Sequence, residues 1–174
     1  GILLRGGASS NTIGGTTASQ RNVISGNDAK GILLLDVGTS NNVIQGNYIG
    51  TNATGTAVLG NSNTGIQIET DADSNKIGGT AAGAGNLISG NTGNGITFLA
   101  ANNSVVQGNI IGLNAAGTGD LGNTVHGISI SGGMSNTIGG TTAAARNVIS
   151  GNNSHGVSLT GSTSSNTIQG NYIG

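Results

Sequence analysis

The sequence contains no cysteine, no proline and no tryptophan, and it has only five basic and six acidic residues in 174. Without cysteine there is neither a disulfide framework nor a thiolate metal site. The net charge is −1, and two Tyr and one Phe are the whole aromatic content, which is unlike a nucleic-acid-binding protein. No apolar run approaches the length of a membrane span. We therefore expect no binding to nucleic acid and no membrane insertion.

Glycine, asparagine and isoleucine dominate the composition, with 35, 24 and 19 copies. Leu, Ile, Val and Phe together make up 40 of the 174 residues, roughly 23%, which lies above the range typical of disordered chains. The helix-favouring residues Glu, Lys, Arg and Gln are scarce, whereas Gly and Asn favour turns and Ile favours strands. This composition predicts an all-β domain with many turns.

Two sequence phrases recur along the whole chain. The first is NTIGGTTASQRNVISGN at 11–27, which returns as NKIGGTAAGAGNLISGN at 75–91 and as NTIGGTTAAARNVISGN at 136–152. The second is QGNYIG at 45–50 and 169–174, with QGNIIG at 107–112. The copies are 61 to 64 residues apart, and a shorter phrase, G-N-x-x-x-G-[IV], returns about every 31 residues. A period of this length is typical of repeat architectures.

Each unit of about 31 residues contains three short apolar phrases separated by Gly and Asn. They are N-x-I-x-G, then an apolar stretch before G-N such as NVIS or AVL, and finally G-I-x-[LIF]. Because each phrase is too short for a helix, we expect three short strands joined by turns. The units alternate between two types, and the segment QGNYIGTNATGTAVLGN carries three extra residues, which predicts a bulge or a longer turn.

Three strands per unit at near-constant length predict a parallel β-helix, in which each unit makes one coil and equivalent strands stack. The expected fold is all-β: a right-handed parallel β-helix of about six coils, forming one domain over residues 1–174. Helical repeats, leucine-rich repeats and left-handed hexapeptide helices each have a periodicity that this sequence lacks. We expect the domain to be a segment of a longer array or a subunit that assembles end to end.

Strand alternation and repeat position predict how the coils stack. Two inward columns of the G-I-x-[LIF] strands should repeat about every 4.8 Å. An Asn follows a turn Gly in five coils, and stacked Asn amides can bond to one another along the axis, so we expect a structural ladder. The inward residues are Ile2, Leu4, Ile32, Leu34, Ile66, Ile68, Ile96, Phe98, Ile128, Ile130, Val157 and Leu159, and the ladder residues are Asn27, Asn61, Asn91, Asn123 and Asn152.

The stacked Asn, the GN-x-x-x-GI phrase and the N-x-I-x-G strands resemble right-handed parallel β-helix proteins of the pectate-lyase-like fold. The phrase at 136–152 is most similar to SNTIGGTTAAARNVISGN-type repeats of large bacterial surface and secreted proteins. The resemblance covers the whole chain. It implies the fold well and function poorly, because such folds host lyases, hydrolases, adhesins and passive stalks.

The acidic residues offer little for catalysis. Pectate-lyase-like chemistry would need clustered Asp or Glu for Ca²⁺ with a nearby Arg, and polygalacturonase-like hydrolysis would need paired Asp residues in adjacent coils. Only Glu69, Asp71 and Asp73 are close in sequence, in the stretch ETDADSN. They are weak candidates for a cation site, because the stretch lacks the Gly and the distal ligand of an EF-hand, and a solvated turn is the alternative. We expect no catalytic residue, no cofactor and no resident metal.

Histidine and arginine also recur at repeat positions. His126 and His155 each precede the Gly-[IV] of adjacent coils, so their side chains should lie about 5 Å apart. No third ligand shares their column, which favours exposed turn residues over a metal site. Arg21 and Arg146 occupy one repeat position and should lie at the surface, and Arg5 can pair with Asp36 one coil on.

The outward position of the G-I-x-[LIF] strand is polar in the four later coils, but in the first two coils it is occupied by Leu3 and Leu33. Leu35 lies beside them, and the three leucines form a candidate interface. We therefore predict self-association through the coil ends or this Leu-bearing face, with a glycan surface as a further possible partner. The expected function is a non-catalytic structural module at the cell surface or outside the cell, such as a stalk, an adhesin segment or a filament subunit. The alternative is the scaffold of a polysaccharide-active enzyme or a carbohydrate-binding module.

Overall fold

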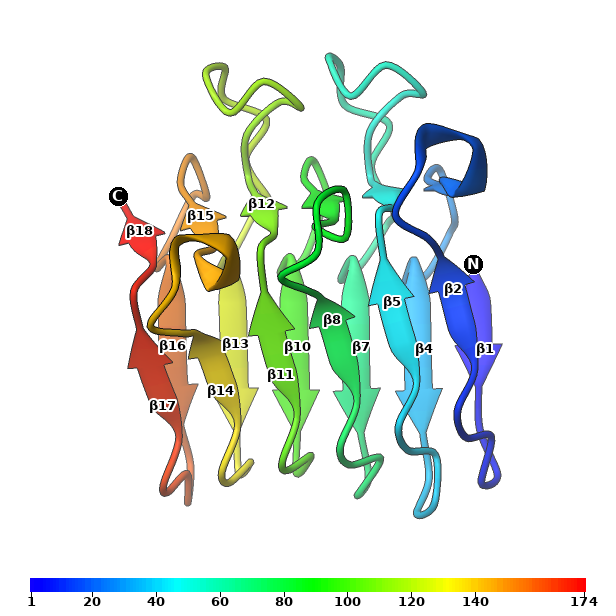
Figure 1. Cartoon of the computed structure of the whole chain (residues 1–174), viewed down its shortest axis with the longest axis vertical. Coiled ribbons are helices and arrows are strands. Elements are labelled where there is room, and N and C mark those ends of the chain that lie inside the picture. Colours follow the sequence, from blue (N-terminus) through cyan, green and yellow to red (C-terminus); the bar gives the residue numbers. More distant parts are fainter.

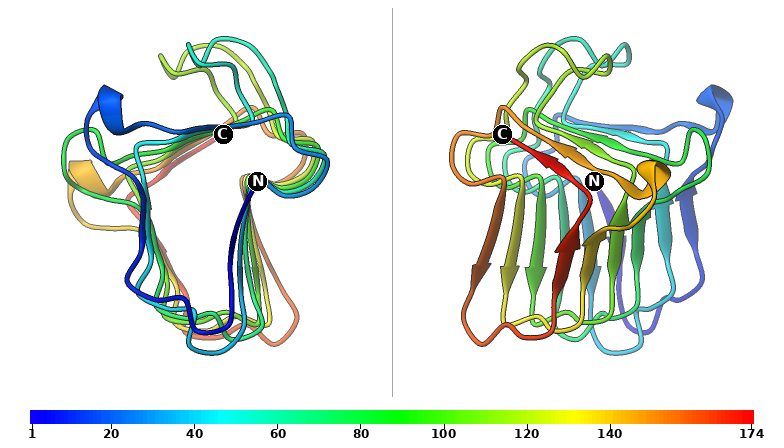
Figure 2. Two further views of the ribbon diagram at one scale, coloured as in Figure 1. Left: turned by 90° about the vertical axis from the view of Figure 1, so that its right-hand side faces the viewer. Right: turned by 60° about the vertical axis from the view of Figure 1, so that its left-hand side comes forward.

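All 174 residues are described by a computed structural model, in which the chain winds into six coils of three short strands each (Figure 1). Every coil contributes one strand to each of three six-stranded parallel sheets, here called sheets A, B and C. Seen from the N-terminal end, the chain runs clockwise as it recedes, so the solenoid is right-handed (Figure 2). The predicted fold class is therefore confirmed.

The strands are two to four residues long, and their bounds follow the repeat. Sheet A contains β1 (Ile2–Leu4), β4 (Ile32–Leu35), β7 (Ile66–Glu69), β10 (Ile96–Leu99), β13 (Ile128–Ser131) and β16 (Val157–Thr160). Sheet B contains β2 (Thr12–Gly14), β5 (Val43–Gln45), β8 (Lys76–Gly78), β11 (Val105–Gln107), β14 (Thr137–Gly139) and β17 (Thr167–Gln169). Sheet C contains β3 (Val23–Ile24), β6 (Tyr48–Ile49), β9 (Leu87–Ile88), β12 (Ile110–Ile111), β15 (Val148–Ile149) and β18 (Tyr172–Ile173).

The core is a set of apolar columns inside the coil, to which each sheet A strand of the middle coils contributes two residues and each strand of sheets B and C one. Ile96 pairs in register with Ile66 on one side and with Ile128 on the other, and all three are fully buried. Phe98 is the only aromatic residue inside, between Ile68 and Ile130. The predicted inward columns are confirmed in coils two to five. In the sixth coil Val157 is half-buried and Leu159 is 41% exposed.

Two outward-facing residues of sheet A are buried although alternation places them on the solvent side. Gln67 and Thr97 are only 7% and 6% exposed. A turn residue of the neighbouring corner lies against Thr97, since Asn94 Nδ2 donates to Thr97 Oγ1 at 2.9 Å, and the Gln67 side chain donates to Glu69 of its own strand. The outer face of this sheet is therefore partly covered in the middle coils, which the strand pattern alone does not predict.

The second strand of the longer coils is not the AVL phrase predicted from the sequence. The structure pairs Tyr48–Ile49 with Val23–Ile24 and with Leu87–Ile88, so the strand lies inside QGNYIG. Val58 instead belongs to a projecting loop closed by an antiparallel bridge to Thr51, and it is 56% exposed. The prediction was wrong because both stretches are short and apolar, and only the register with neighbouring coils separates them.

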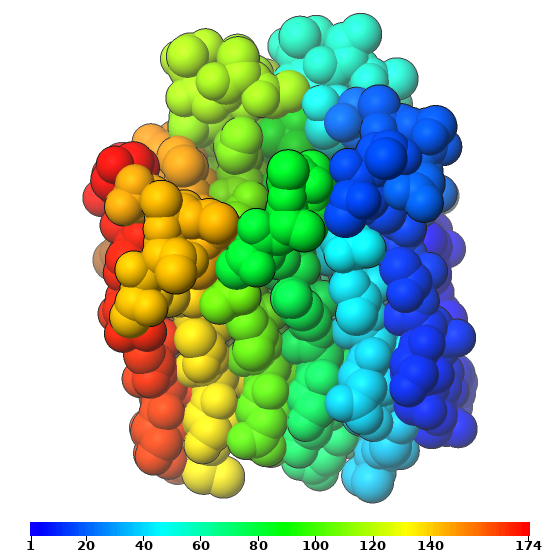
Figure 3. All heavy atoms as spheres, viewed as in Figure 1, coloured from blue at the N-terminus to red at the C-terminus, as the bar shows by residue number.

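Two different insertions alternate, and this explains the near-constant period. The first, third and fifth coils have loops between sheets B and C, at 15–22, 79–86 and 140–147, and two of these contain a 3₁₀ turn, η1 (Ala18–Gln20) and η2 (Ala143–Ala145). The second and fourth coils have hairpin-like loops between sheets C and A, at 51–58 and 113–120. The loops of each kind stand in a row above the strands (Figures 1 and 3). The longer turn expected in QGNYIGTNATGTAVLGN is thus confirmed.

At one shared position in the tight corners between sheets A and B, every coil has a residue in the left-handed region. These residues have φ between 56° and 59°, and all of them are Ser or Asn: Ser10, Asn41, Ser74, Asn103, Ser135 and Ser165. Asn tolerates this conformation better than most residues, and Ser is small.

No helix in the structure has the length and apolar character needed to span a bilayer.

Candidate functional site

Three parallel ladders of side-chain amides follow the three corners of the coil. The predicted column, Asn27, Asn61, Asn91, Asn123 and Asn152, is confirmed and marks the corner between sheets C and A. A second ladder marks the corner between sheets A and B and contains Asn11, Asn42, Asn75, Ser104, Asn136 and Asn166. A third marks the corner between sheets B and C and contains Asn22, Asn47, Asn86, Asn109, Asn147 and Asn171.

With the exception of Asn75, whose neighbour in the next coil is Ser104, the ladder asparagines of the middle coils use their amides in both directions along the axis. In Asn91, the backbone N–H and the Nδ2 group both donate to Oδ1 of Asn123, at 3.1 and 2.9 Å. The Nδ2 group also donates back to the carbonyl oxygen of Ile49 at 3.3 Å, and Oδ1 accepts from Asn61. No buried side-chain N or O atom in the chain lacks a partner, so these fully buried amides carry no desolvation penalty from an unmade bond.

The second and third ladders were missed by sequence reasoning, although their signal is present. Asn begins every N-x-I-x-G phrase except at Ser104, and another Asn precedes each sheet C strand in the RNV, GNL and QGN phrases. The fixed spacing therefore identified the repeated phrases, but it did not show that their Asn side chains lie at the corners and form ladders. Ser104 shows what a ladder position needs, since its Oγ accepts the Asn75 N–H and its own N–H donates to Asn136 Oδ1.

His126 and His155 stack face to face at the corner between sheets C and A. Their ring centroids are 5.3 Å apart and the rings are within 9° of parallel, close to the predicted 5 Å. The backbone N–H of His155 donates to Nδ1 of His126 at 3.2 Å, so that nitrogen has no proton in this arrangement. Burial, followed by the nearby charge of His155, lowers the pKa of His126 below its ordinary value of 6.5. The arrangement thus favours a neutral His126, in which the lone pair of Nδ1 accepts the hydrogen bond from His155.

Two of the three acidic candidates have different hydrogen-bond partners, and the third is exposed without one. Glu69 ends β7 and accepts a hydrogen bond from Gln67. Asp71 is exposed and adopts φ 57° in the turn, and Asp73 Oδ1 accepts the backbone N–H of Asn102 in the next coil at 2.7 Å. No group of three or more His, Cys, Asp or Glu side chains in the chain is arranged to hold a metal ion. In this arrangement Asp73 serves the contact between coils.

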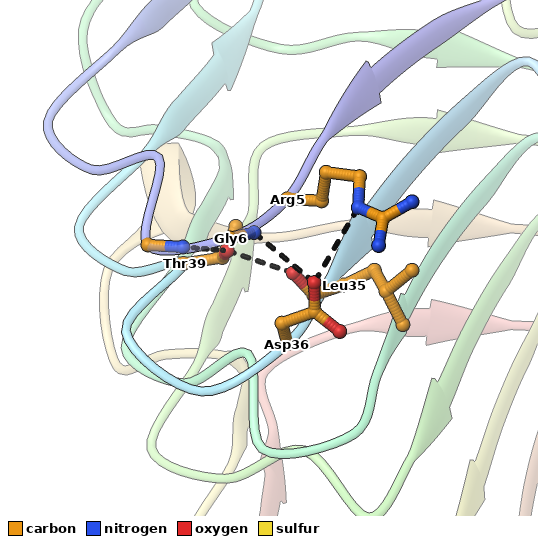
Figure 4. A network of polar contacts seen from close by, with 6 residues as sticks. Arg5, Gly6, Leu35, Asp36 and Thr39 are labelled. Atoms are coloured by element: carbon orange, nitrogen blue, oxygen red, sulfur yellow. Dashed lines mark hydrogen bonds and ion pairs between the residues drawn. The ribbon is translucent and has the colours of Figure 1, made fainter.

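Arg5 and Asp36 lie one coil apart and form the predicted ion pair, with Nε 3.6 Å from Oδ2 (Figure 4). Asp36 Oδ2 also accepts the Gly6 N–H at 3.1 Å, and Thr39 donates to the Leu35 carbonyl at 2.7 Å. The Arg5 side chain is 64% exposed, and an exposed pair of this kind contributes about 0–1 kcal/mol. The network thus closes the first corner turn and shows no feature of a reactive site.

Arg21 and Arg146 lie at the surface as expected, and each stacks on a tyrosine of the following coil. The Arg21 Cζ atom is 4.0 Å from the centroid of the Tyr48 ring, and Arg146 Cζ is 4.1 Å from that of Tyr172. Each guanidinium Nε also donates to a turn carbonyl, Gly46 or Gly170. Cation–π contacts at exposed sites contribute about 0.5–1 kcal/mol. These repeated pairs were not found from the sequence, where Arg and Tyr are 27 and 26 residues apart.

The Leu-bearing face is smaller than the sequence pattern suggested. Leu3 is 54% exposed, whereas Leu33 and Leu35 are half-buried. A hollow of about 220 Å³ lies beside Leu3 and Leu33 at the first coil. The apolar surface at this end therefore consists of one exposed side chain and the edges of two others.

Breaking the predicted ladder in its buried centre should destabilise the fold. Asn91→Leu removes the acceptor of Asn61 and the donors to Asn123 and Ile49, so we expect a loss of about 1–3 kcal/mol in the free energy of unfolding. Urea denaturation measures this difference. Asn153→Leu is the matched control, because Asn153 is exposed and lies beside the ladder. Equal stability of both variants would contradict the role of the ladder.

The lowered pKa of His126 predicts a stability that depends on pH. The folded chain binds a proton at His126 less readily than the unfolded chain, so the contribution is complete above the unfolded pKa and is lost as the pH falls through 6.5 and below. The urea midpoint should therefore drop between about pH 8 and about pH 5, and it should drop less in His126→Asn. Asn is the matched choice because Asn94 occupies the same position one coil earlier. An identical drop in both proteins would refute the assignment.

Comparisons with known proteins give no further identity. No protein-family model matches the chain, and neither a curated protein nor a solved structure matches it significantly. The structural description of the chain is therefore that of a parallel β-solenoid with three asparagine ladders.

Proposed function

We propose that the chain is a non-catalytic structural module that acts outside the cell or at its surface, as part of a stalk, an adhesin or a filament. The observation that carries this proposal is the set of three ladders. Polar side chains at every corner of the middle coils, all of them amides except the Ser104 hydroxyl, are used to join one coil to the next. A chain that uses its buried polar groups in this way is built for axial continuity and rigidity.

The charges of the chain support the same function. The 11 charged residues are distributed over several corners, and the single ion pair is exposed. A surface with few charges is suited to a spacer that contacts its surroundings weakly. The finer form of the proposal is that copies of this chain stack end to end, since β1, β2 and β3 and, at the other end, β16, β17 and β18 are edge strands with unpaired backbone groups.

End-to-end stacking predicts short fibres of the 174-residue chain in electron micrographs, with a coil repeat of about 4.8 Å along the fibre. Ile168→Lys places a charge at the inward position of the edge strand β17, where Ile168 is 39% exposed, and should leave single particles. Thr167→Lys is the matched control on the outward side of the same strand and should still form fibres. Single particles of the unchanged chain would remove the filament from the proposal and leave the stalk or adhesin.

A glycan assay separates the structural module from the enzyme alternative. We expect no cleavage of pectin-like or other acidic glycans by this chain, with or without Ca²⁺. If cleavage occurs and is lost in the triple variant Glu69→Ala, Asp71→Ala, Asp73→Ala, the non-catalytic proposal is wrong and the polysaccharide-active scaffold takes its place. Circular dichroism of the triple variant checks that the coils remain folded.

A further inference from the structure

The third coil departs from the repeat at the loop between sheets B and C. Gly85 occupies the position of Arg21 and Arg146, and in the following coil Ile110 occupies the position of Tyr48 and Tyr172. Both members of the Arg–Tyr pair are thus replaced together by smaller residues. The loop 79–86 also lacks the 3₁₀ turn of its two counterparts, and in Figure 3 it forms a slimmer column between them.

The missing pair leaves a pocket on the outer face of sheet C. Its volume is about 170 Å³, and Gly83, Gly85, Leu87 and Ile110 line it together with Arg21. The ring of Tyr48 closes one side, and Ala115 of the hairpin-like loop 113–120 lies on the other. Each of the other four hollows of the molecule is lined by Gly1 or Gly174. This pocket alone lies within the array and is independent of the first and last residues of the chain.

The lining combines an apolar floor with one positive charge. Leu87 is 3% exposed, and with Ile110 and the Tyr48 ring it supplies the floor. Arg21 is the only charged residue of the lining, and it belongs to no ion pair, since the one ion pair of the chain joins Arg5 and Asp36. Its Nε donates to the Gly46 carbonyl at 3.4 Å and its plane stacks on Tyr48, but its terminal N–H groups donate to no group of the chain, so this edge of the guanidinium is available.

We propose that this pocket binds a small organic carboxylate with a flat apolar body, of the size of benzoate. The carboxylate matches the two-donor geometry of the free guanidinium edge, and the ring matches the Leu–Ile–Tyr floor. The volume is well below the roughly 300–1,000 Å³ of sites for drug-sized ligands, which limits the ligand to about one ring. The site is built from the interruption of the repeat and does not depend on the structural role proposed above.

Titration of the folded chain with benzoate, followed by NMR chemical shifts, tests the site. We expect a Kd of about 1 mM or lower, with shifts confined to residues around Leu87 and Ile110. Benzyl alcohol has the ring without the charge and should bind at least about tenfold more weakly, as should the cation benzylammonium. Equal binding of all three compounds would overturn the charge assignment, and no binding of benzoate at about 10 mM would overturn the site.

Two variants and one matched control locate the binding. Arg21→Gln should weaken benzoate binding by at least about tenfold, whereas Arg146→Gln, at the same repeat position outside the pocket, should leave it unchanged. Ile110→Tyr introduces the residue of the second and sixth coils, fills the pocket and should abolish binding. Unchanged melting temperatures show that the variants are folded. Retained binding in Ile110→Tyr, or equal loss in both Arg variants, would refute the site.

Discussion

The structure depends on the satisfaction of polar backbone and amide groups at the three corners of each coil. Strands of two to four residues make few ladder hydrogen bonds of their own, and 61 of the 91 backbone hydrogen bonds lie outside the regular elements. The corners are buried, so every N–H and C=O there must find a partner or destabilise the fold. An asparagine side chain fits this need because its amide has one acceptor oxygen and two N–H donors, and it is long enough to reach the neighbouring coils. The apolar columns then fill the interior that these corners enclose.

The coarse fold followed from the sequence because repetition makes the argument redundant. The phrase at 11–27 returns twice, and the same three apolar phrases in successive units support the same fold independently. The inward columns from Ile32 to Ile130, the Asn27 to Asn152 ladder and the 5 Å spacing of the two histidines are all consequences of coil stacking. These features depend on position within a repeat, which the sequence states directly.

The features that could not be predicted depend on contacts between unlike positions. The choice between Tyr48–Ile49 and the AVL phrase for the second strand needed the register across coils. The burial of Thr97 involves Asn94, a turn residue that lies against it at the edge of the sheet. The pocket beside Arg21 arises from two substitutions, at Gly85 and Ile110, that are 25 residues apart in sequence and meet only in the folded coil. These three features are visible only in the folded structure, because sequence periodicity predicts what the coils share and each of the three is a departure from the repeat.

Because the two loop types alternate, the structural repeat of the solenoid is two coils and not one. Loops of one kind meet across the coil between them: Ala115 donates to the Gly55 carbonyl at 2.9 Å, and a side chain on Gly83 would collide with the Thr16 carbonyl. Removal or insertion of a single coil would place two loops of the same kind in adjacent coils, without the intervening coil that now separates them, and would break the regular spacing of the rows. A gain or loss of two coils would keep every row in phase. The smallest segment by which such an array can grow or shrink is therefore a pair of coils, about 62 residues, which is the spacing at which its two phrases recur.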